Sequence, residues 1–242
     1  MIGGAQMNWI LSFEEFAPLF AENGLTLTPE LYAQLEQYAR LLVEWNEKMN
    51  LTGITDPQGI SLKHFLDSLL LLKHYTPPQG AKIIDVGTGA GFPGIPLKLY
   101  RPDLRLTLLD SLQKRLRFLE EVSSQLGFAA ECVHARAEEG ARTPLRERFD
   151  LVTARAVAAL PVLCEYCLPY VKVGGVFAAL KGPSEDAAEA HSAIQLLGGE
   201  LMGVKYDSIP NGDGRMFVFI KKISQTPTKY PRNSGQIAKK SL

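Results

Sequence analysis

The sequence predicts an α/β fold, in which a mostly parallel sheet is covered by helices on both faces and is preceded by a helical extension. Three observations predict it. From residue 81 onward, short β-rich runs alternate with helical runs, whereas no strand pattern precedes that position. The strand runs are almost continuously apolar, which is typical of strands that are buried on both faces. A glycine-rich turn separates the first strand run from the next helical run.

The first 76 residues predict helices only. Ser12 and Glu15 have the spacing of a capping box, and Thr28-Pro29 gives an N-cap followed by a first-turn proline. After Pro29, apolar residues recur with helical spacing up to Met49. Residues 50–59 form a polar loop in this prediction, and residues 60–73 form a further apolar helix.

Seven strands are expected in the rest of the chain. The first five are at 81–86, 106–110, 131–134, 149–153 and 176–180, and a late hairpin pairs 200–206 with 216–220. Helical runs at 97–100, 112–126 and 161–171 lie between the strands. These patterns divide the chain into a helical extension (1–76), an α/β domain (77–225) and an irregular basic tail (226–242).

Composition excludes several classes of protein. The 242 residues are 46% hydrophobic and 21% charged, which is typical of a globular chain and argues against disorder. No apolar run reaches the roughly 20 residues that a membrane span needs. Three cysteines are too few for a disulfide scaffold, so a cytoplasmic protein without a membrane partner is expected.

The net charge of zero conceals a gradient along the chain. The first 39 residues contain five glutamates and no Lys or Arg, whereas the last 22 contain six cations and no acid. A basic end of this kind is compatible with binding to a polyanion, although such tails are more often simply solvated.

The glycine-rich turn is the most informative segment. Gly87, Gly89 and Gly91 follow the first strand and are in turn followed by Phe92, so the segment has the context of a nucleotide-binding loop. Asp85 lies two residues before the first glycine, where its charge would repel a pyrophosphate but attract the cationic groups of S-adenosylmethionine. The pattern therefore favours S-adenosylmethionine over NAD.

Further site residues are expected at the carboxyl ends of the later strands, where open α/β sheets bind ligands. Asp110 ends the second strand, 19 residues after Gly91, and can accept hydrogen bonds from the ribose hydroxyls. Ala137 and Glu138 follow the third strand and are placed to hold the adenine. Arg155 and Lys181 follow the fourth and fifth strands, which suggests that an anionic partner approaches the cofactor.

Several motifs together resemble one family, the bacterial small-subunit ribosomal RNA guanine-N7 methyltransferases, also called glucose-inhibited division protein B (RsmG or GidB). The resemblance covers residues 30–242. It rests on the following segments: Trp45-Asn46, Asn50-Leu51-Thr52, His64, Asp67-Ser68, residues 85–96, Leu109-Asp110-Ser111, Lys114-Arg115, Phe118-Leu119, residues 136–139, Arg155-Ala156, Lys181-Gly182 and Tyr230-Pro231-Arg232. The chain ends in Ser241-Leu242 where the family ordinarily ends in Pro-Leu.

The resemblance implies a Rossmann-like class I methyltransferase fold and methylation of a guanine N7 in the 530 loop of 16S rRNA, with S-adenosylmethionine as donor. It also implies that Gly87, Phe92, Ala137, Glu138 and Arg155 line the cofactor site. The acceptor is 16S rRNA, either free or within a 30S subunit or assembly intermediate, and no metal is implied. A monomer is expected.

The expected chemistry needs no general base, because guanine N7 has an in-plane lone pair and no proton to lose. Catalysis is then mostly positioning of N7 in line with the sulfonium methyl group. Arg155 and Lys181 are the candidate catalytic residues, which would hold the target nucleotide and stabilise charge near it.

Two other functions stay open from the residues alone: methylation of a small molecule, and a non-catalytic dinucleotide-binding module. Two further motifs have plainer interpretations. Cys164 and Cys167 are interpreted as buried thiols rather than a zinc half-site. His64 and Asp67 are interpreted as a polar contact between the helical extension and the α/β domain.

Overall fold

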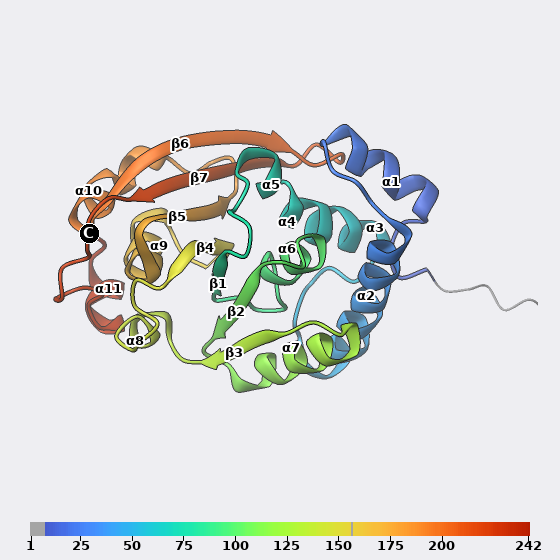
Figure 1. Ribbon diagram of the computed structural model, residues 1–242, viewed down its shortest axis with the longest axis horizontal. Helices are drawn as coiled ribbons and strands as arrows, with labels where there is room; N and C mark the ends of the chain where they lie inside the picture. Colours follow the sequence, from blue (N-terminus) through green and yellow to red (C-terminus); the bar gives the residue numbers. More distant parts are fainter. Residues whose placement is uncertain (1–7, 156) are drawn as a thin grey trace, which may run out of the picture.

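The computed structural model describes residues 8–155 and 157–242, so residues 1–7 of the predicted extension and Ala156 of the resemblance motif lie outside the described residues. Its centre is a seven-stranded sheet in the order β3-β2-β1-β4-β5-β7-β6 (Figure 1). The strands are β1 (Lys82–Val86), β2 (Arg105–Asp110), β3 (Ala130–His134), β4 (Phe149–Arg155), β5 (Val171–Lys181), β6 (Gly199–Ser208) and β7 (Gly214–Lys222).

Strands β1 to β5 pair in parallel, and β7 runs antiparallel between β5 and β6. This confirms the predicted α/β class and each of the seven expected strands. Because β1 to β5 run in one direction, their carboxyl ends meet at one edge of the sheet. That edge therefore brings together Val86, Asp110, His134, Arg155 and Lys181.

Helices cover both faces of the sheet, and two separate clusters of buried apolar side chains lie between the layers. Six short or medium helices belong to the α/β part: α6 (Gly94–Tyr100), α7 (Gln113–Leu126), α8 (Ala137–Gly140), α9 (Leu160–Cys167), α10 (His191–Leu196) and α11 (Ser234–Lys239). Two 3₁₀ turns accompany them, η2 (Leu168–Tyr170) and η3 (Ala187–Ala190).

The helical extension begins with α1 (Phe13–Glu22) and α2 (Pro29–Met49). The predicted capping box at Ser12 and the predicted N-cap at Thr28 are both present. Residues 60–73 were expected to form one helix, but the chain instead forms α3 (Pro57–Gly59), a π-helical turn η1 (Ile60–Leu66), α4 (Asp67–Leu69) and α5 (Leu71–His74). Such π-turns recur at functional sites.

The extension shares a hydrophobic core with the sheet. Tyr38 and Phe65 are fully buried in the same cluster as Ile83 and Leu106, which lie in β1 and β2. In Figure 1 helices α1 and α2 lie together at one side of the molecule, next to α3 and α4. Position 77 therefore marks a change in secondary structure between two parts that are packed on one core.

The expectation of an irregular tail is wrong for residues 234–239, which form α11. Asn233 caps this helix, and Gln236 completes a capping box with it. The tail also packs on the α/β part, because Arg232 forms an ion pair with the fully buried Glu165 at 2.6 Å. Pro227 and Pro231 before the helix, and Gly235 within it, led to the prediction of an irregular segment.

Candidate functional site

The glycine loop turns back over the end of β2. The backbone N–H groups of Gly87 and Thr88 donate to the carbonyl oxygen of Leu109, at 2.8 and 3.1 Å. Gly87 has a φ of 68°, and a Cβ atom there would lie 2.9 Å from Cγ2 of Val157. Glycine at position 87 thus permits both the left-handed turn and the close approach of the chain that follows β4.

Asp85 lies beneath this loop and is fully buried. Its carboxylate accepts hydrogen bonds from the hydroxyls of Thr88 (2.6 Å) and Thr153 (2.9 Å) and from the N–H of Gly94 (3.1 Å). Burial raises the pKa of Asp85, and these hydrogen bonds oppose the rise. The structure therefore gives Asp85 a role in shaping the loop, which the sequence argument about ligand charge did not anticipate.

A cavity of about 350 Å³, here called the Asp110 cavity, lies at the carboxyl ends of β1, β2 and β4. Five of the residues predicted for the cofactor line it: Gly87, Asp110, Ala137, Glu138 and Arg155. The walls also include Val86, Leu109, Ser111, Arg115, Ala135, Arg136, Val157 and Tyr166. The other four predicted cofactor residues, Asp85, Gly89, Gly91 and Phe92, are not among its lining residues.

Asp110 retains capacity for a ligand although it is only 2% exposed. One carboxylate oxygen accepts from the N–H of Gly89 at 2.9 Å and lies 3.3 Å from Arg115, and the other accepts from the N–H of Leu112 at 2.9 Å. An ionised carboxylate offers about four acceptor positions. One position thus remains for a hydroxyl donor in the cavity.

Glu138 supplies a second carboxylate to the same cavity. Its side chain is 6% exposed, and within the described part of the chain its carboxylate accepts no hydrogen bond. The residue lines the cavity, so the N–H or O–H group of a ligand bound there can donate to its carboxylate. Asp110 and Glu138 therefore fit a ligand that donates hydrogen bonds at two places, as a nucleoside does.

A larger cavity of about 700 Å³, here called the Lys181 cavity, adjoins the first. Arg155 and Val157 line both cavities, so these two residues form their common boundary. The Lys181 cavity is lined by Ile54, Lys63, His64, Asp67, Arg155, Val157, Ala158, Leu180, Lys181, Gly182, Glu185, Asp213 and Arg215. It therefore receives residues from the helical extension, from β4 and β5, and from the β6–β7 hairpin.

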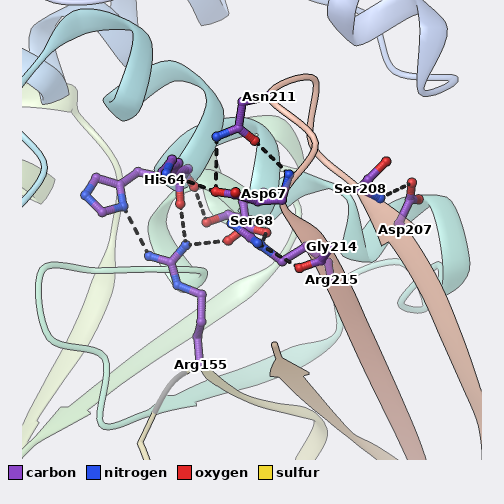
Figure 2. Close-up of polar contacts among 11 residues, drawn as sticks. His64, Asp67, Ser68, Arg155, Asp207, Ser208, Asn211, Gly214 and Arg215 are labelled. Carbon is purple, nitrogen blue, oxygen red and sulfur yellow. Dashed lines mark hydrogen bonds and ion pairs between the residues drawn. The ribbon is translucent and has the colours of Figure 1, made fainter. Parts of the chain in front are cut away.

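Arg155, the last residue of β4, reaches into the helical extension (Figure 2). Its Nη1 donates to the carbonyl oxygen of Lys63 and to Asp67, both at 2.9 Å. Its Nη2 lies 3.4 Å from Nδ1 of His64. The guanidinium also lies 5.1 Å from the centre of the Phe92 ring, which is a cation–π distance.

Phe92 supports Arg155 from the side of the glycine loop. Its ring stacks on His64, with ring centres 4.4 Å apart, and on Tyr38 at 5.4 Å. The neighbouring Gly91 has no room for a side chain, because a Cβ atom would lie 2.5 Å from the hydroxyl oxygen of Tyr38. These two loop residues thus contact the helical extension and the boundary residue Arg155.

Lys181 lies at the end of β5, and its ammonium group is buried and already paired. It donates to the carbonyl oxygen of Ala158 and forms an ion pair with Glu185. The other cations of this cavity are paired as well, with Lys63 on Asp213 at 2.9 Å and Arg215 on Asp67 at 2.6 Å. The cavity therefore presents cations whose positions are fixed by neighbouring carboxylates.

Sequence reasoning did not place Lys63, Asp213 or Arg215 at the site. Arg215 lies immediately after the Asn211–Gly214 turn. Its contact with Asp67 could not be predicted, because the two residues are far apart in the sequence. The prediction that His64 and Asp67 join the extension to the α/β domain is confirmed by their contacts with Arg155. Cys164 and Cys167 are buried, as predicted, and burial raises the pKa of Cys164 to about 12.

Residues 8–155 and 157–242 contain no group of three or more His, Cys, Asp or Glu side chains that could hold a metal ion. Over the same residues, no helix is long and apolar enough to cross a membrane.

A profile of the GidB family, described as rRNA small subunit methyltransferase G, matches residues 31–209. Relatives with that same name match almost the whole chain. The protein of Alkaliphilus metalliredigens is 50% identical over 226 residues, covering 91% of this chain and 95% of its own. The protein of Desulforamulus reducens is 49% identical over 221 residues, covering 89% and 92%.

The chain belongs to the rRNA small subunit methyltransferase G family. The resemblance drawn from the sequence motifs is thereby confirmed. Membership also confirms the predicted enzyme class, a methyltransferase, and the predicted methyl donor, S-adenosylmethionine.

Solved structures agree with the fold of this methyltransferase. A putative methyltransferase of Haloferax volcanii, solved with its Trm112 activator, superposes with a TM-score of 0.57 at 14% identity, covering 76% of this chain and 98% of its own. TYW2 of M. jannaschii, solved in complex with AdoMet, gives a TM-score of 0.51 at 14% identity over 65% of this chain and 77% of its own. These similarities confirm the class I methyltransferase fold.

Proposed function

We propose that this methyltransferase transfers a methyl group from S-adenosylmethionine to N7 of a guanine in the 530 loop of 16S rRNA. The observation that supports this most directly is the pair of adjoining cavities with Arg155 at their boundary. One cavity has the carboxylates that suit a nucleoside donor, and the other has fixed cations that suit a polyanionic acceptor. The family name, which specifies small-subunit rRNA, supports the same substrate.

The Asp110 cavity is the proposed site of the donor. Asp110 would accept from the ribose hydroxyls, and Glu138 and the backbone at Ala137 would hold the adenine. Gly87 lets the loop approach the ligand closely, whereas Asp85, Gly89, Gly91 and Phe92 would act by shaping the loop. When bound, S-adenosylmethionine supplies an electrophilic methyl group on its sulfonium.

The Lys181 cavity is the proposed site of the target nucleotide. Guanine N7 carries an in-plane lone pair and needs no base, so the residues here need only to orient the nucleotide and exclude water. Arg155 and Lys181 would bind oxygen atoms of the nucleotide or its phosphate, and the apolar Ile54 and Leu180 would contact the base. Positioning of the nucleotide is therefore the main contribution expected of the protein.

We propose that the enzyme acts as a monomer, as the family resemblance led us to expect. The transfer itself needs neither a metal nor a second subunit. We assign the enzyme to the cytoplasm, where ribosomal subunits are assembled. The acceptor cavity would lie between the helical extension (1–76) and the α/β domain (77–225). The tail (226–242) would stabilise the α/β domain by packing on it.

The test is to incubate the enzyme with labelled S-adenosylmethionine and 30S subunits from a strain that lacks this methylation, and then to map the modified nucleotide. Arg155→Lys keeps the charge but loses the planar fork of donors, so methyl transfer should fall by about 10- to 100-fold. Arg105→Ala is the control. Arg105 begins β2, at the edge of the sheet opposite to the carboxyl ends that line the cavities, so this variant should keep full activity. Label at another atom or base, or in a small molecule only, would refute the proposal.

Calorimetry separates the remaining alternative, a dinucleotide-binding module. The proposal expects binding of S-adenosylmethionine and none of NAD at the same concentration. Binding of NAD alone would contradict it.

A further inference from the structure

The donors of Arg155 are only partly used within the protein. A guanidinium has five N–H groups. Two on Nη1 donate to Lys63 and Asp67, and one on Nη2 faces His64. Within the described residues, Nε–H and the second proton of Nη2 have no acceptor, and Arg155 lines both cavities. Two donors therefore remain for a ligand, and their direction depends on the three that are held.

His64 is fixed as a neutral acceptor for one of these contacts. Its Nε2 lies 2.9 Å from the hydroxyl oxygen of Thr52, which also accepts from the N–H of Ile54 at 3.0 Å. Because the guanidinium of Arg155 can only donate, Nδ1 is the acceptor, and the proton of the neutral ring is on Nε2, which donates to Thr52. Burial, together with the positive charge of Arg155, lowers the pKa of His64 to about 3, in agreement with a neutral ring.

Thr52 is held in turn by the preceding helix. The backbone N–H of Thr52 donates to the side-chain oxygen of Asn46 at 2.8 Å. Asn46 lies in α2, so the path from α2 through Thr52 to His64 ends on the guanidinium of Arg155. Asn46 and Thr52, one residue from each of two resemblance motifs, thus help to fix the orientation of the His64 ring.

Asp67 fixes the opposite side of Arg155. It is 4% exposed, and its two carboxylate oxygens contact two different guanidinium groups, Arg155 at 2.9 Å and Arg215 at 2.6 Å (Figure 2). Arg155 follows Asp67 by 88 residues and Arg215 follows it by 148. One carboxylate between two like charges keeps both arginines at the wall of the Lys181 cavity.

We propose that His64 and Asp67, both from the helical extension, are positioning residues that direct the two remaining N–H donors of Arg155 toward oxygen atoms of the RNA acceptor. This inference rests on the proposed function of the Lys181 cavity. It makes the extension one half of the acceptor site, because without His64 and Asp67 the Arg155 side chain has only one of its three protein acceptors left, the carbonyl of Lys63.

Attachment of the extension does not require these polar contacts. Tyr38, Phe65 and other apolar side chains already bury the extension against the sheet. A buried ion pair is commonly no more stabilising than an apolar contact of similar volume, because desolvation offsets the attraction. The positioning of Arg155 is therefore the physical effect that distinguishes this cluster from ordinary packing.

The chain offers a matched control. Asp207, in β6, forms an ion pair with Lys73 at 2.8 Å, and its carboxylate lies 3.1 Å from Nε2 of His74, so it also links the extension to the sheet. Asp207 lines neither cavity. Asp67→Asn and Asp207→Asn thus each weaken a partly buried contact between the same two parts of the molecule, and only the first acts on Arg155.

The experiment measures kcat and KM for methyl transfer to 30S subunits, together with the Kd for S-adenosylmethionine, in the full-length enzyme. Asp67→Asn should lower kcat by about 10- to 100-fold and leave the Kd for S-adenosylmethionine within about twofold. Asp207→Asn should leave both unchanged. His64→Asn, whose amide oxygen can replace Nδ1, should retain more kcat than His64→Leu.

The outcomes separate the two proposals. If the unmodified enzyme transfers no methyl group to the 30S subunit, the proposed function fails and this inference fails with it. If the unmodified enzyme is active but Asp67→Asn loses no more kcat than Asp207→Asn, only the positioning role is overturned. If urea unfolding shows that Asp67→Asn is less stable than the unmodified enzyme, kcat is measured at a temperature where the variant is fully folded. A lower kcat than that of Asp207→Asn under those conditions supports the positioning role.

Discussion

The hydroxyl of Tyr38, in helix α2, donates a hydrogen bond to the carbonyl oxygen of Ala90 in the glycine loop, 52 residues later in the chain. Tyr38 is fully buried, and the burial of its phenol raises its pKa well above the usual value, so the hydroxyl stays a donor at all accessible pH values. The helical extension therefore contacts the glycine loop as well as Arg155.

Gly91→Ala should destabilise the loop strongly. The new Cβ atom would lie 2.5 Å from the hydroxyl oxygen of Tyr38 and 2.7 Å from Cδ1 of Ile95, at a φ of 98°. Overpacking and left-handed strain of this kind cost about 1–3 kcal/mol each, so urea unfolding should show a loss of at least 2 kcal/mol. Adding Tyr38→Phe removes the closest atom and should recover part of the loss. No loss of stability in Gly91→Ala would contradict this geometry.

His64 should make the protein less stable in mild acid. Its pKa in the folded protein is lowered to about 3 by burial and by Arg155, below the value of about 6.5 in the unfolded chain. As the pH falls from 6.5 toward 3, the unfolded chain takes up a proton that the folded protein does not, so the free energy of unfolding decreases.

The measurement is the free energy of urea unfolding between pH 7 and pH 5 for the unmodified enzyme and His64→Asn. Well below pH 6.5, the contribution of one such proton approaches about 1.4 kcal/mol per pH unit. The slope should be smaller by up to that amount in His64→Asn. Equal slopes would show that His64 titrates normally.

Asp110 should control affinity for the donor. Asp110→Asn keeps the size of the side chain but leaves one oxygen in place of two, and Asp110→Ala removes the acceptor of the Gly89 and Leu112 N–H groups as well. A hydrogen bond to a charged acceptor contributes about 1.5–3 kcal/mol, so the Kd for S-adenosylmethionine should rise by about 10- to 100-fold. Isothermal calorimetry measures this rise, and an unchanged Kd in both variants would exclude Asp110 from the donor site.

The tail should contribute to stability through Arg232. Its guanidinium donates three hydrogen bonds to the fully buried Glu165 carboxylate, at 2.9, 3.2 and 2.6 Å. Arg232→Met would leave that charge unpaired, at a cost of about 3–5 kcal/mol. The double variant Arg232→Met with Glu165→Gln removes the charge and should be more stable than Arg232→Met alone. The reverse order in urea unfolding would refute this account of the ion pair.

Local patterns predicted most of the fold. The parallel strands could be located because most of them are nearly continuous apolar runs, and the antiparallel pair β6 and β7 was located from the turn between them. The glycine loop was recognisable from Gly87, Gly89 and Gly91. The helix α11 was missed, because its capping residues Asn233 and Gln236 stand in a short, polar, proline-containing segment. The π-turn η1 was missed because the apolar spacing of residues 60–73 resembles that of an ordinary helix.

The sequence by itself determined the α/β class, the glycine loop, and the placement of Asp110, Arg155 and Lys181 at strand ends, because each of these follows from residues close together in the chain. The tertiary structure alone decided that Asp85 is buried under the loop and that Asp67 joins Arg155 to Arg215. Contacts across 88 and 148 residues depend on how the extension and the hairpin pack on the sheet, and no local pattern encodes that packing.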